Sequence, residues 1–339
     1  MVQYEQFQNL STFGRSKRQR SFTARVSIGS IMLPAMINEG YDMKFALATI
    51  ASAGILGVII PPSITFVIYG MATSSSIGDL FLGGFIPGIL LAFGMSVYAI
   101  YCGMNNFKEK QYQEFSFRVV CESFREAFWA ILTPVIVLGG IYLGVFTPTE
   151  AAAVTILYGM LVGLFIYKEL SLMQVLEIMK SSVRTSAMIL FIVACASAFS
   201  YVLTLAQIPT AIAHWLTNIS AGDQFVFLAL VTIFLLIVGV MMDSVPALLI
   251  LAPILAVPAL GVGIDKVAFG IIMCVNLSIG LLTPPVGMNL YVAASIAKQP
   301  ASMVINKHLF IYISLALGVL IILMAVQDII LFLPHLARK

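Results

Sequence analysis

Two long apolar stretches of this 339-residue sequence are each interrupted by a pair of adjacent prolines. The first stretch runs from Phe45 to Met71 and contains Pro61-Pro62, and the second, residues 267–297, contains Pro284-Pro285. Proline has no N–H to donate and its ring clashes with the preceding helical turn, so a Pro-Pro pair ends or breaks an α-helix. Each stretch is therefore predicted to form a helix, a break and a second, shorter helix.

The composition places these breaks in a lipid bilayer. Hydrophobic residues make up 60% of the chain and charged residues only 10%, whereas a soluble domain averages about 45–50% apolar and about 25% charged residues. Such a chain cannot cover a water-facing surface with polar side chains, so we predict an all-α polytopic membrane protein. The 18 basic and 15 acidic residues nearly cancel, which gives no reason to expect nucleic-acid binding.

Motifs for other chemistries are missing from the sequence. It has no GxxxxGK[ST] loop and no HExxH helix, so neither ATP-driven pumping nor zinc hydrolysis is encoded and no enzyme activity is expected. The four cysteines form no CxxC pair and the three histidines are dispersed, so no transition-metal site is predicted. An intramembrane aspartyl protease needs paired carboxylates, and Asp243 has no partner in a span except Asp328, near the end of the last one.

The alternation of polar and apolar segments divides the chain into four parts. Residues 1–26 form a polar, basic tail that is predicted to be disordered. Residues 27–104 hold the remainder of a first repeat, which consists of a short hairpin arm, the first broken helix and a span. Residues 105–126 form an amphipathic connector at the membrane interface. Residues 127–339 form a second repeat, with spans near 127–146, 150–167 and 185–204, a connector at 170–183, a hairpin around 225–258, the broken helix 267–297 and a last span.

Basic residues orient these spans, because short cytoplasmic loops retain Lys and Arg. If the run from Phe225 to Val262 enters and leaves on one side as a hairpin with Asp243 at its tip, nearly all basic residues fall on one face, which we assign to the cytoplasm. A full crossing would instead put Lys298 and Lys307 outside. The charge distribution therefore favours a hairpin.

The two broken helices are copies of one motif. Gly57 to Ser63 (GVIIPPS) matches Gly280 to Val286 (GLLTPPV), and Ile31 to Ala35 resembles Leu249 to Ile254 at a slightly different offset. Four predicted crossings separate the copies, so they run antiparallel. Two broken helices in inverted repeats are typical of secondary transporters; the alternative is a pair of proline kinks with packing roles only.

In a helix, each proline pair removes the i+4 partners of two carbonyls, those of Gly57 and Val58 in the first copy and of Gly280 and Leu281 in the second. Such orphan groups are tolerated in a bilayer only where they line a protein-enclosed or watery cavity. Carbonyls of this kind suit a hard monovalent cation, and the N-terminus of the half-helix beyond suits an anion.

Polar residues beside the breaks and at the hairpin tip complete the candidate site. Asp243 is a candidate by default, as a carboxylate in the membrane, but it can also be a solvent-facing turn acid. Intramembrane Asn and Ser side chains can also simply hold helices together. The candidate cation- and substrate-binding residues are Gly57, Pro61, Pro62, Ser63, Asp243, Ser244, Asn276, Gly280, Thr283, Pro284, Pro285 and Asn289.

Several motifs resemble the large membrane subunit of the TRAP (tripartite ATP-independent periplasmic) transporters, of the DctM and SiaM type. They are IGSIMLPAM at 28–36, the Pro-Pro motif at 57–63, FTPTEAAA at 146–153, Met242-Asp243 with LLILAP at 248–253, and residues 269–287. The resemblance extends from residue 27 to about residue 333. It implies a multi-pass protein of the bacterial inner membrane that works as a sodium-driven, elevator-type importer of a small organic acid.

The resemblance leaves the substrate open among C4-dicarboxylates, sialic acid and other sugar acids. It implies Na⁺ as the coupling ion and no other cofactor. It also implies two partner proteins, a small DctQ-like membrane subunit and a periplasmic substrate-binding protein that delivers the substrate.

The resemblance also assigns the ion sites, because family cation sites lie between each hairpin tip and the adjacent broken helix. The second site would involve Asp243, Ser244 and residues 280–285, and the first would involve residues 57–63 and a tip just before Ile28. There the sequence departs from the family, since residues 21–27 are not Gly/Ser-rich and nothing in 1–25 matches the spans that precede this tip. We therefore expect a chain without the family's first quarter, and the alternative function is a truncated, transport-inactive membrane remnant that retains at most subunit association.

Overall fold

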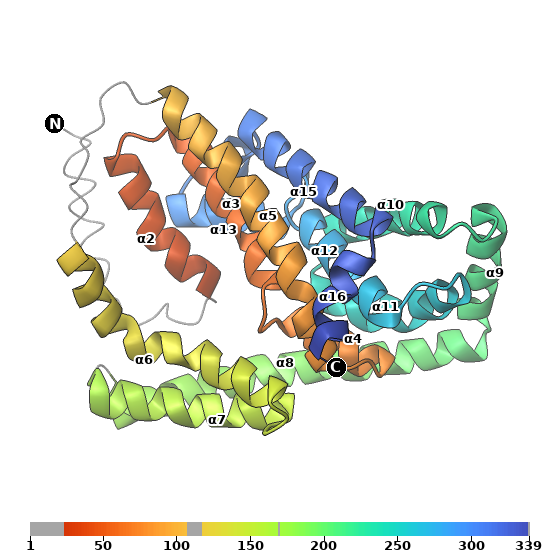
Figure 1. The fold of residues 1–339 in the computed structure, drawn as a ribbon, viewed down its shortest axis with the longest axis horizontal. Coiled ribbons are helices and arrows are strands. Elements are labelled where there is room, and N and C mark those ends of the chain that lie inside the picture. Colours follow the sequence, from red (N-terminus) through yellow and green to blue (C-terminus); the bar gives the residue numbers. More distant parts are fainter. Residues whose placement is uncertain (1–23, 107–116, 169, 338–339) are drawn as a thin grey trace.

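The computed structural model describes residues 24–106, 117–168 and 170–337, and these residues form helices joined by short turns, without a strand (Figure 1). Six of the helices are long and apolar enough to cross a membrane, and a bent pair, α3 with α4, is a seventh candidate. The six are α5 (Ile77–Asn106), α7 (Pro148–Leu161) with its π-helical extension η2 (Val162–Ile166), α8 (Leu172–Leu205), α10 (Gln224–Met241), α11 (Ser244–Gly261) and α15 (Lys307–Ala325). The prediction of an all-α polytopic membrane protein is confirmed.

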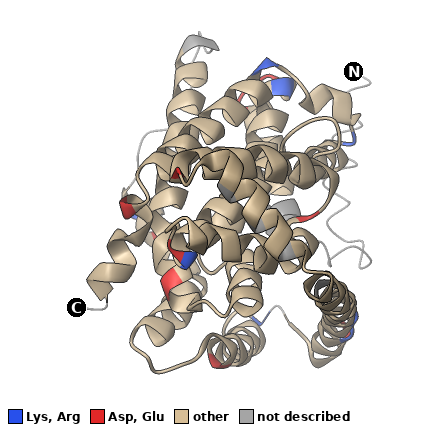
Figure 2. Cartoon of the chain, turned by 90° about the vertical axis from the view of Figure 1, so that its right-hand side faces the viewer, with Lys and Arg blue, Asp and Glu red and all other residues tan. Residues whose placement is uncertain are grey.

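The remaining helices are shorter or only partly apolar. They are α2 (Ala24–Asn38), α3 (Met43–Ile59), α4 (Ile64–Thr73), α6 (Phe117–Tyr142), α9 (Ile208–Ser220), α12 (Lys266–Gly280), α13 (Met288–Ala297), α14 (Ala301–Val304) and α16 (Asp328–Ala337). Figure 2 shows that the charged residues are sparse and that long helical stretches carry none of them. The described helices thus offer apolar surface where a bilayer would cover them.

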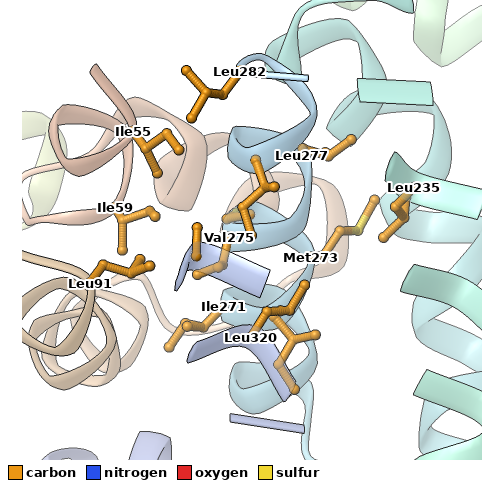
Figure 3. Packing of buried hydrophobic residues seen from close by; sticks show 14 of the residues in the cluster. Ile55, Ile59, Leu91, Leu235, Ile271, Met273, Val275, Leu277, Leu282 and Leu320 are labelled. Carbon is orange, nitrogen blue, oxygen red and sulfur yellow. The ribbon is translucent and has the colours of Figure 1, made fainter. Parts of the chain in front are cut away.

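Helix α12 lies at the centre of the fold. Every residue from Val267 to Gly280 is buried, and the helix contacts α3, α4, α5, α10, α11, α15 and α16. In Figure 3, Val275 points toward Ile55, while Met273 lies on the opposite side of α12, toward Leu235. The residues that lead into the second break are therefore fixed by packing on several sides.

The two broken helices begin with the same turn, 223 residues apart in the sequence. Each turn has a glycine at φ = 84°, Gly40 or Gly263, and an aspartate two residues later, Asp42 or Asp265. This left-handed conformation is one that glycine adopts without strain. The aspartate then caps the helix: its carboxylate accepts two backbone N–H groups of the first turn, at 3.1 and 3.3 Å for Asp42 and at 2.7 and 3.2 Å for Asp265.

Both helices break at their proline pairs, as predicted. Helix α3 ends at Ile59 and resumes as α4, bent by 42°, and α12 ends at Gly280 and resumes as α13. The Pro61-Pro62 and Pro284-Pro285 peptide bonds are both cis. Each half-helix has 10 residues and ends at a residue in the left-handed conformation, so the two copies match from the capping turn to the end of the half-helix.

The two repeats interlock. Helix α11 packs along α4 of the first repeat, α2 packs along α13 of the second, and α3 contacts α12. Tyr69 of α4 illustrates the contact, because its hydroxyl donates to the carbonyl of Lys266 at 2.9 Å and its ring fills the space that a side chain at Gly270 would need. The two broken helices consequently form one unit rather than two separate kinks.

The run from Phe225 to Val262 is a helical hairpin with a single break. Helices α10 and α11 contact each other and are joined by Met242 and Asp243, so the predicted break at Asp243 is confirmed. Pro246, Pro253 and Pro258 do not break this run further, since all three lie within α11. Pro246 lies in the first turn of α11, where no helical N–H is lost. Pro253 and Pro258 lie in the interior of α11, and their sequence neighbours Ala252 and Ala259 are buried against other helices.

Two expected connectors do not stand apart from the spans that follow them. The end of the 105–126 connector continues from Phe117 into the next span as α6, and the 170–183 stretch continues into the span at 185–204 as α8. Residues 107–116 of the first connector, and most of the tail at 1–26, lie outside the described residues.

The segment between α8 and the hairpin, which contains the polar residues His214 and Asn218, is also helical. It forms α9, which Figure 1 shows lying across the ends of α8 and α10. This helix is amphipathic, since Leu216 is buried whereas Trp215 is exposed. Its apolar positions recur at helical spacing, which explains why polar residues within it do not end the helix.

The shared capping turn can be tested on the second copy. Replacing Asp265 by Ala removes the acceptor for two backbone N–H groups at the start of α12, and we expect a stability loss of about 1 kcal/mol, as for other helix N-caps. Thermal unfolding of the detergent-solubilised protein measures the loss as a lower Tm. Asp265→Ser is the control, because serine also caps; an equal Tm for Asp265→Ala and the unchanged protein would contradict the assignment.

Candidate ion and substrate site

At the first break, two hydroxyl groups replace the N–H that proline lacks. The Ser63 hydroxyl donates to the carbonyl of Val58, and the Thr65 hydroxyl donates to the same carbonyl at 3.1 Å. The two hydroxyl oxygens are 2.8 Å apart, and both side chains are buried. Pro62 has no N–H to offer Val58, so its carbonyl is satisfied by side chains instead. The sequence prediction missed Thr65. A second hydroxyl-bearing residue two positions after Ser63 could have indicated it.

The other side of the first break is open. Gly57 is exposed, and a Cβ placed on it would meet no atom within 4 Å. Pro61 is buried and Pro62 is exposed, and Pro61 cannot donate to the carbonyl of Gly57. The first break therefore combines a buried hydroxyl cluster with an uncovered stretch of backbone.

The second break satisfies its carbonyls in a different way. The carbonyl of Gly280 accepts the N–H of Thr283 at 3.0 Å, and the carbonyl of Leu281 accepts the N–H of Asn289 at 3.0 Å. The Thr283 hydroxyl donates to the carbonyl of Ile279 at 2.9 Å. The expectation that the carbonyls of Gly280 and Leu281 remain orphaned is therefore wrong, because N–H groups of the loop and of α13 replace those lost at Pro284 and Pro285.

Carbonyl oxygens converge within this second loop. A Cβ at Gly287 would lie 2.8 Å from the carbonyl oxygen of Leu281 and 2.9 Å from that of Thr283, so only glycine fits there. Pro284 is half-buried and Pro285 is exposed, as Pro62 is in the first break. Carbonyl oxygens brought together around unwound backbone are the groups that coordinate Na⁺ in broken transporter helices.

Two asparagines flank the second break and are both buried. Asn276, on α12, is fully buried, and neither its amide nitrogen nor its amide oxygen has a hydrogen-bond partner among the described residues. Asn289, in the first turn of α13, lies against α3, where a Cβ at Gly54 would be 3.1 Å from its amide nitrogen. An unpaired buried amide costs about 1–3 kcal/mol, so Asn276 is a group that a ligand would satisfy.

The hairpin tip carries Asp243 and Ser244. The Asp243 side chain is exposed, and its carboxylate accepts the N–H of Ser244 at 2.8 Å, which makes Asp243 the N-cap of α11. The Ser244 side chain is buried, and its hydroxyl has no hydrogen-bond partner among the described residues. The tip therefore presents one exposed charge and one unpaired buried hydroxyl.

The predicted site residues fall into two groups. Asp243 and Ser244 follow directly after α10, which packs along the helix that carries Asn276 and Gly280. Gly57, Pro61, Pro62 and Ser63 form the other group at the first break. The hairpin tip expected just before Ile28 falls on the start of α2 and on residues outside the described part of the chain.

Both half-helices begin without a side-chain cap. The N-cap residue of α4 is Ser63, whose hydroxyl accepts no hydrogen bond from the first turn, and that of α13 is Gly287, which has no side chain. This contrasts with α3 and α12, which aspartates cap. The dipole at such helix ends favours an anion, although the N–H groups of Asn289 and Leu290 in α13 already donate to the carbonyls of Leu281 and Gly287. In the described residues, no group of three or more His, Cys, Asp or Glu side chains could hold a metal ion.

Comparison with known proteins identifies the family. The sequence profile of the "Tripartite ATP-independent periplasmic transporter, DctM component" matches residues 21–329. The chain belongs to the DctM family. Members of this family are transporters rather than enzymes, and the apolar helices are those of a protein of the bacterial inner membrane.

Curated DctM relatives are similar over most of the chain. The isethionate TRAP transporter permease protein DctMQ of Oleidesulfovibrio alaskensis is 40% identical over 90% of the chain. The C4-dicarboxylate permease DctM of Pseudomonas aeruginosa is 41% identical over 91%, and the sialic acid permease SiaM of Vibrio cholerae is 38% identical over 80%. The chain spans 48%, 72% and 64% of these three relatives, respectively.

The hydroxyl pair at the first break can be tested by a double-mutant cycle. Ser63→Ala or Thr65→Val leaves one hydroxyl on the Val58 carbonyl, whereas the double variant leaves that buried carbonyl without a donor. We expect each single change to cost about 1 kcal/mol and the double variant to cost more than the sum, because only it orphans the acceptor. Thermal unfolding measures all three. Ser314→Ala is the control, since the Ser314 hydroxyl bonds only within its own exposed helical turn; strictly additive losses would contradict the shared role.

Proposed function

We propose that the chain is the membrane-embedded part of a sodium-coupled importer of a small organic acid. The observation that carries the proposal is the matched pair of broken helices, each with unwound backbone at the break and an uncapped half-helix N-terminus beyond it. Breaks of this kind, in inverted repeats, bind the coupling ion through carbonyls and the anionic substrate through helix N-termini in secondary transporters.

The oxygen atoms that could coordinate a cation at the breaks favour a hard monovalent ion. They are backbone carbonyls, the hydroxyls of Ser63 and Thr283, the amide of Asn276, and the carboxylate of Asp243 at the hairpin tip. Hard cations prefer oxygen ligands, whereas soft transition metals prefer thiolate and imidazole. With a single carboxylate near the second break, the site suits one positive charge better than two. Sodium is the proposed coupling ion, held by residues 57–63 at the first site and by Asp243, Ser244 and residues 280–285 at the second.

An anionic substrate fits the half-helices. No lysine or arginine lies between Phe45 and Met71 or in residues 267–297. Lys44 and Lys266 lie only in the first turns of α3 and α12, at the helix ends away from the breaks. The acid group would therefore be held by the positive ends of the α4 and α13 helix dipoles, by nearby hydroxyls and by bound sodium. The relatives named above are permeases for isethionate, C4-dicarboxylates and sialic acid, all small organic acids. This chemistry is the proposed substrate class.

Two partner proteins belong to the proposal. They are a small DctQ-like membrane subunit and a periplasmic binding protein that delivers the substrate, as the tripartite family description suggests. The exposed apolar faces of α6, α7 and α8 offer room for a membrane partner beside the bilayer lipid. The alternative function is a transport-inactive membrane protein that associates with the small subunit only.

Sodium coupling through Asp243 can be separated from its capping role. Asn caps helices as well as Asp does, so Asp243→Asn keeps the cap and loses the charge. In proteoliposomes that hold the chain with its partner proteins, we expect Asp243→Asn to raise the sodium concentration for half-maximal uptake about tenfold, equivalent to ~1.4 kcal/mol. The matched control is Asp328→Asn, an exposed acid in the first turn of α16.

Three results would count against the proposal in different ways. Uptake that is indifferent to sodium in the unchanged chain would exclude sodium coupling. Assembly with the small subunit but no uptake would favour the transport-inactive alternative. An unchanged sodium dependence in Asp243→Asn would leave Asp243 as a helix cap only.

A further inference from the structure

Two glycines bring the backbones of α10 and α12 into close contact beside the second break. A Cβ placed on Gly280, the last residue of α12, would lie 2.6 Å from the Cα and 2.7 Å from the carbonyl carbon of Gly239 on α10. A Cβ on Gly239 would lie 3.0 Å from the carbonyl oxygen of Leu277 and 3.1 Å from the Cα of Gly280. Carbon atoms in ordinary contact are about 3.5–4.0 Å apart. The two helices therefore meet backbone to backbone; Gly280 leaves no room for a methyl group, and a methyl group at Gly239 fits only if its neighbours shift.

This contact lies between two unpaired buried polar groups. Ser244, five residues beyond Gly239, has a buried hydroxyl without a partner, and Asn276, four residues before Gly280, has a buried amide without one. Residues four apart share a helix face, so Asn276 lies on the face of α12 that meets α10. An advance of four residues along α12 is about 6 Å, so Asn276 lies about one turn from the glycine contact, and Ser244 follows α10 after only two extended residues, Met242 and Asp243.

We propose that Gly239 is a positioning residue that sets the distance between the hairpin tip and the second break. Its contact with Gly280 fixes how closely α10 approaches α12, and thereby how closely Asp243 and Ser244 approach Asn276 and the loop at residues 280–285. The inference rests on the proposed sodium site at this tip. Gly239 has no polar side chain and binds nothing itself, which explains why a search for binding residues in the sequence passes over it.

A methyl group at either glycine would push the helices apart. At Gly280 the separation has to grow by about 1 Å to reach ordinary contact, and at Gly239 by less, because its nearest neighbour is farther away. Ion coordination tolerates deviations of only ~0.2 Å in ligand distance. The cation site should therefore weaken although each of its ligands is still present, and it should weaken more in Gly280→Ala than in Gly239→Ala.

The experiment measures sodium-dependent thermal stabilisation of the purified full chain in detergent, with NaCl replaced by KCl at constant ionic strength. A ligand that binds only the folded state raises Tm with its concentration, so the titration gives both a basal Tm and a sodium concentration for half of the effect. We expect that concentration to rise about tenfold in Gly280→Ala, or ~1.4 kcal/mol, and less in Gly239→Ala. Gly94→Ala and Gly318→Ala are the controls, because a Cβ at either position meets no atom within 4 Å.

The possible results separate the positioning role from the alternatives. A lower basal Tm with an unchanged sodium titration in the Gly239 and Gly280 variants would overturn the positioning role and leave a purely structural contact. Titrations equal to those of the two controls would overturn it as well. An unchanged chain that sodium does not stabilise would overturn the proposed sodium site together with this inference. If Gly280→Ala does not fold, the milder Gly239→Ala still gives the titration that decides.

Discussion

A proline pair inside a bilayer takes two N–H donors from a helix where no water can replace them, and each buried group left unpaired costs several kcal/mol. The structure meets this constraint twice. At the first break, the hydroxyls of Ser63 and Thr65 serve the Val58 carbonyl; at the second, N–H groups of Thr283 and Asn289 serve the carbonyls of Gly280 and Leu281. Both solutions need the surrounding helices to exclude lipid, so the packing around α3 and α12 follows from the breaks.

The interlocking of the two repeats supplies that enclosure. Because α11 covers α4 and α2 covers α13, each half-helix lies against an arm of the other repeat. A single broken helix of this kind could not shield its own unwound backbone. The close glycine contacts serve the same purpose, since Gly270 admits the ring of Tyr69 and Gly239 admits Gly280. The glycines thus let backbone and large side chains approach more closely than larger residues at these positions would allow.

The features that the sequence predicts are those with local causes. A pair of adjacent prolines removes two consecutive donors and breaks the helix, and Asp243 lies in the turn after α10 and caps α11, so both breaks and the hairpin turn follow from residue type. Pro253 and Pro258 do not break α11, because the fate of a proline inside a helix depends on which neighbours enclose the freed carbonyl. The capping turn of Gly40 and Asp42, which recurs as Gly263 and Asp265, was not predicted, although its residues repeat at the same offset as the proline pairs. The role of Gly239 has no such signal, since only the fold shows which helix it meets.

The two breaks differ where their sequences differ, and this bears on what each can bind. The first break has Ser63 and Thr65, whose places in the second are taken by Val286 and Met288, so the hydroxyl cluster exists in one copy only. The second break has converging carbonyls around Gly287 and an unpaired amide at Asn276, and α10 brings a carboxylate to its side. The duplicated backbone gives both copies one shape, while the substitutions give them different ligand sets. A pair of cation sites built on these breaks would consequently not be equivalent, and a change at the hairpin tip should act on the second break before it acts on the first.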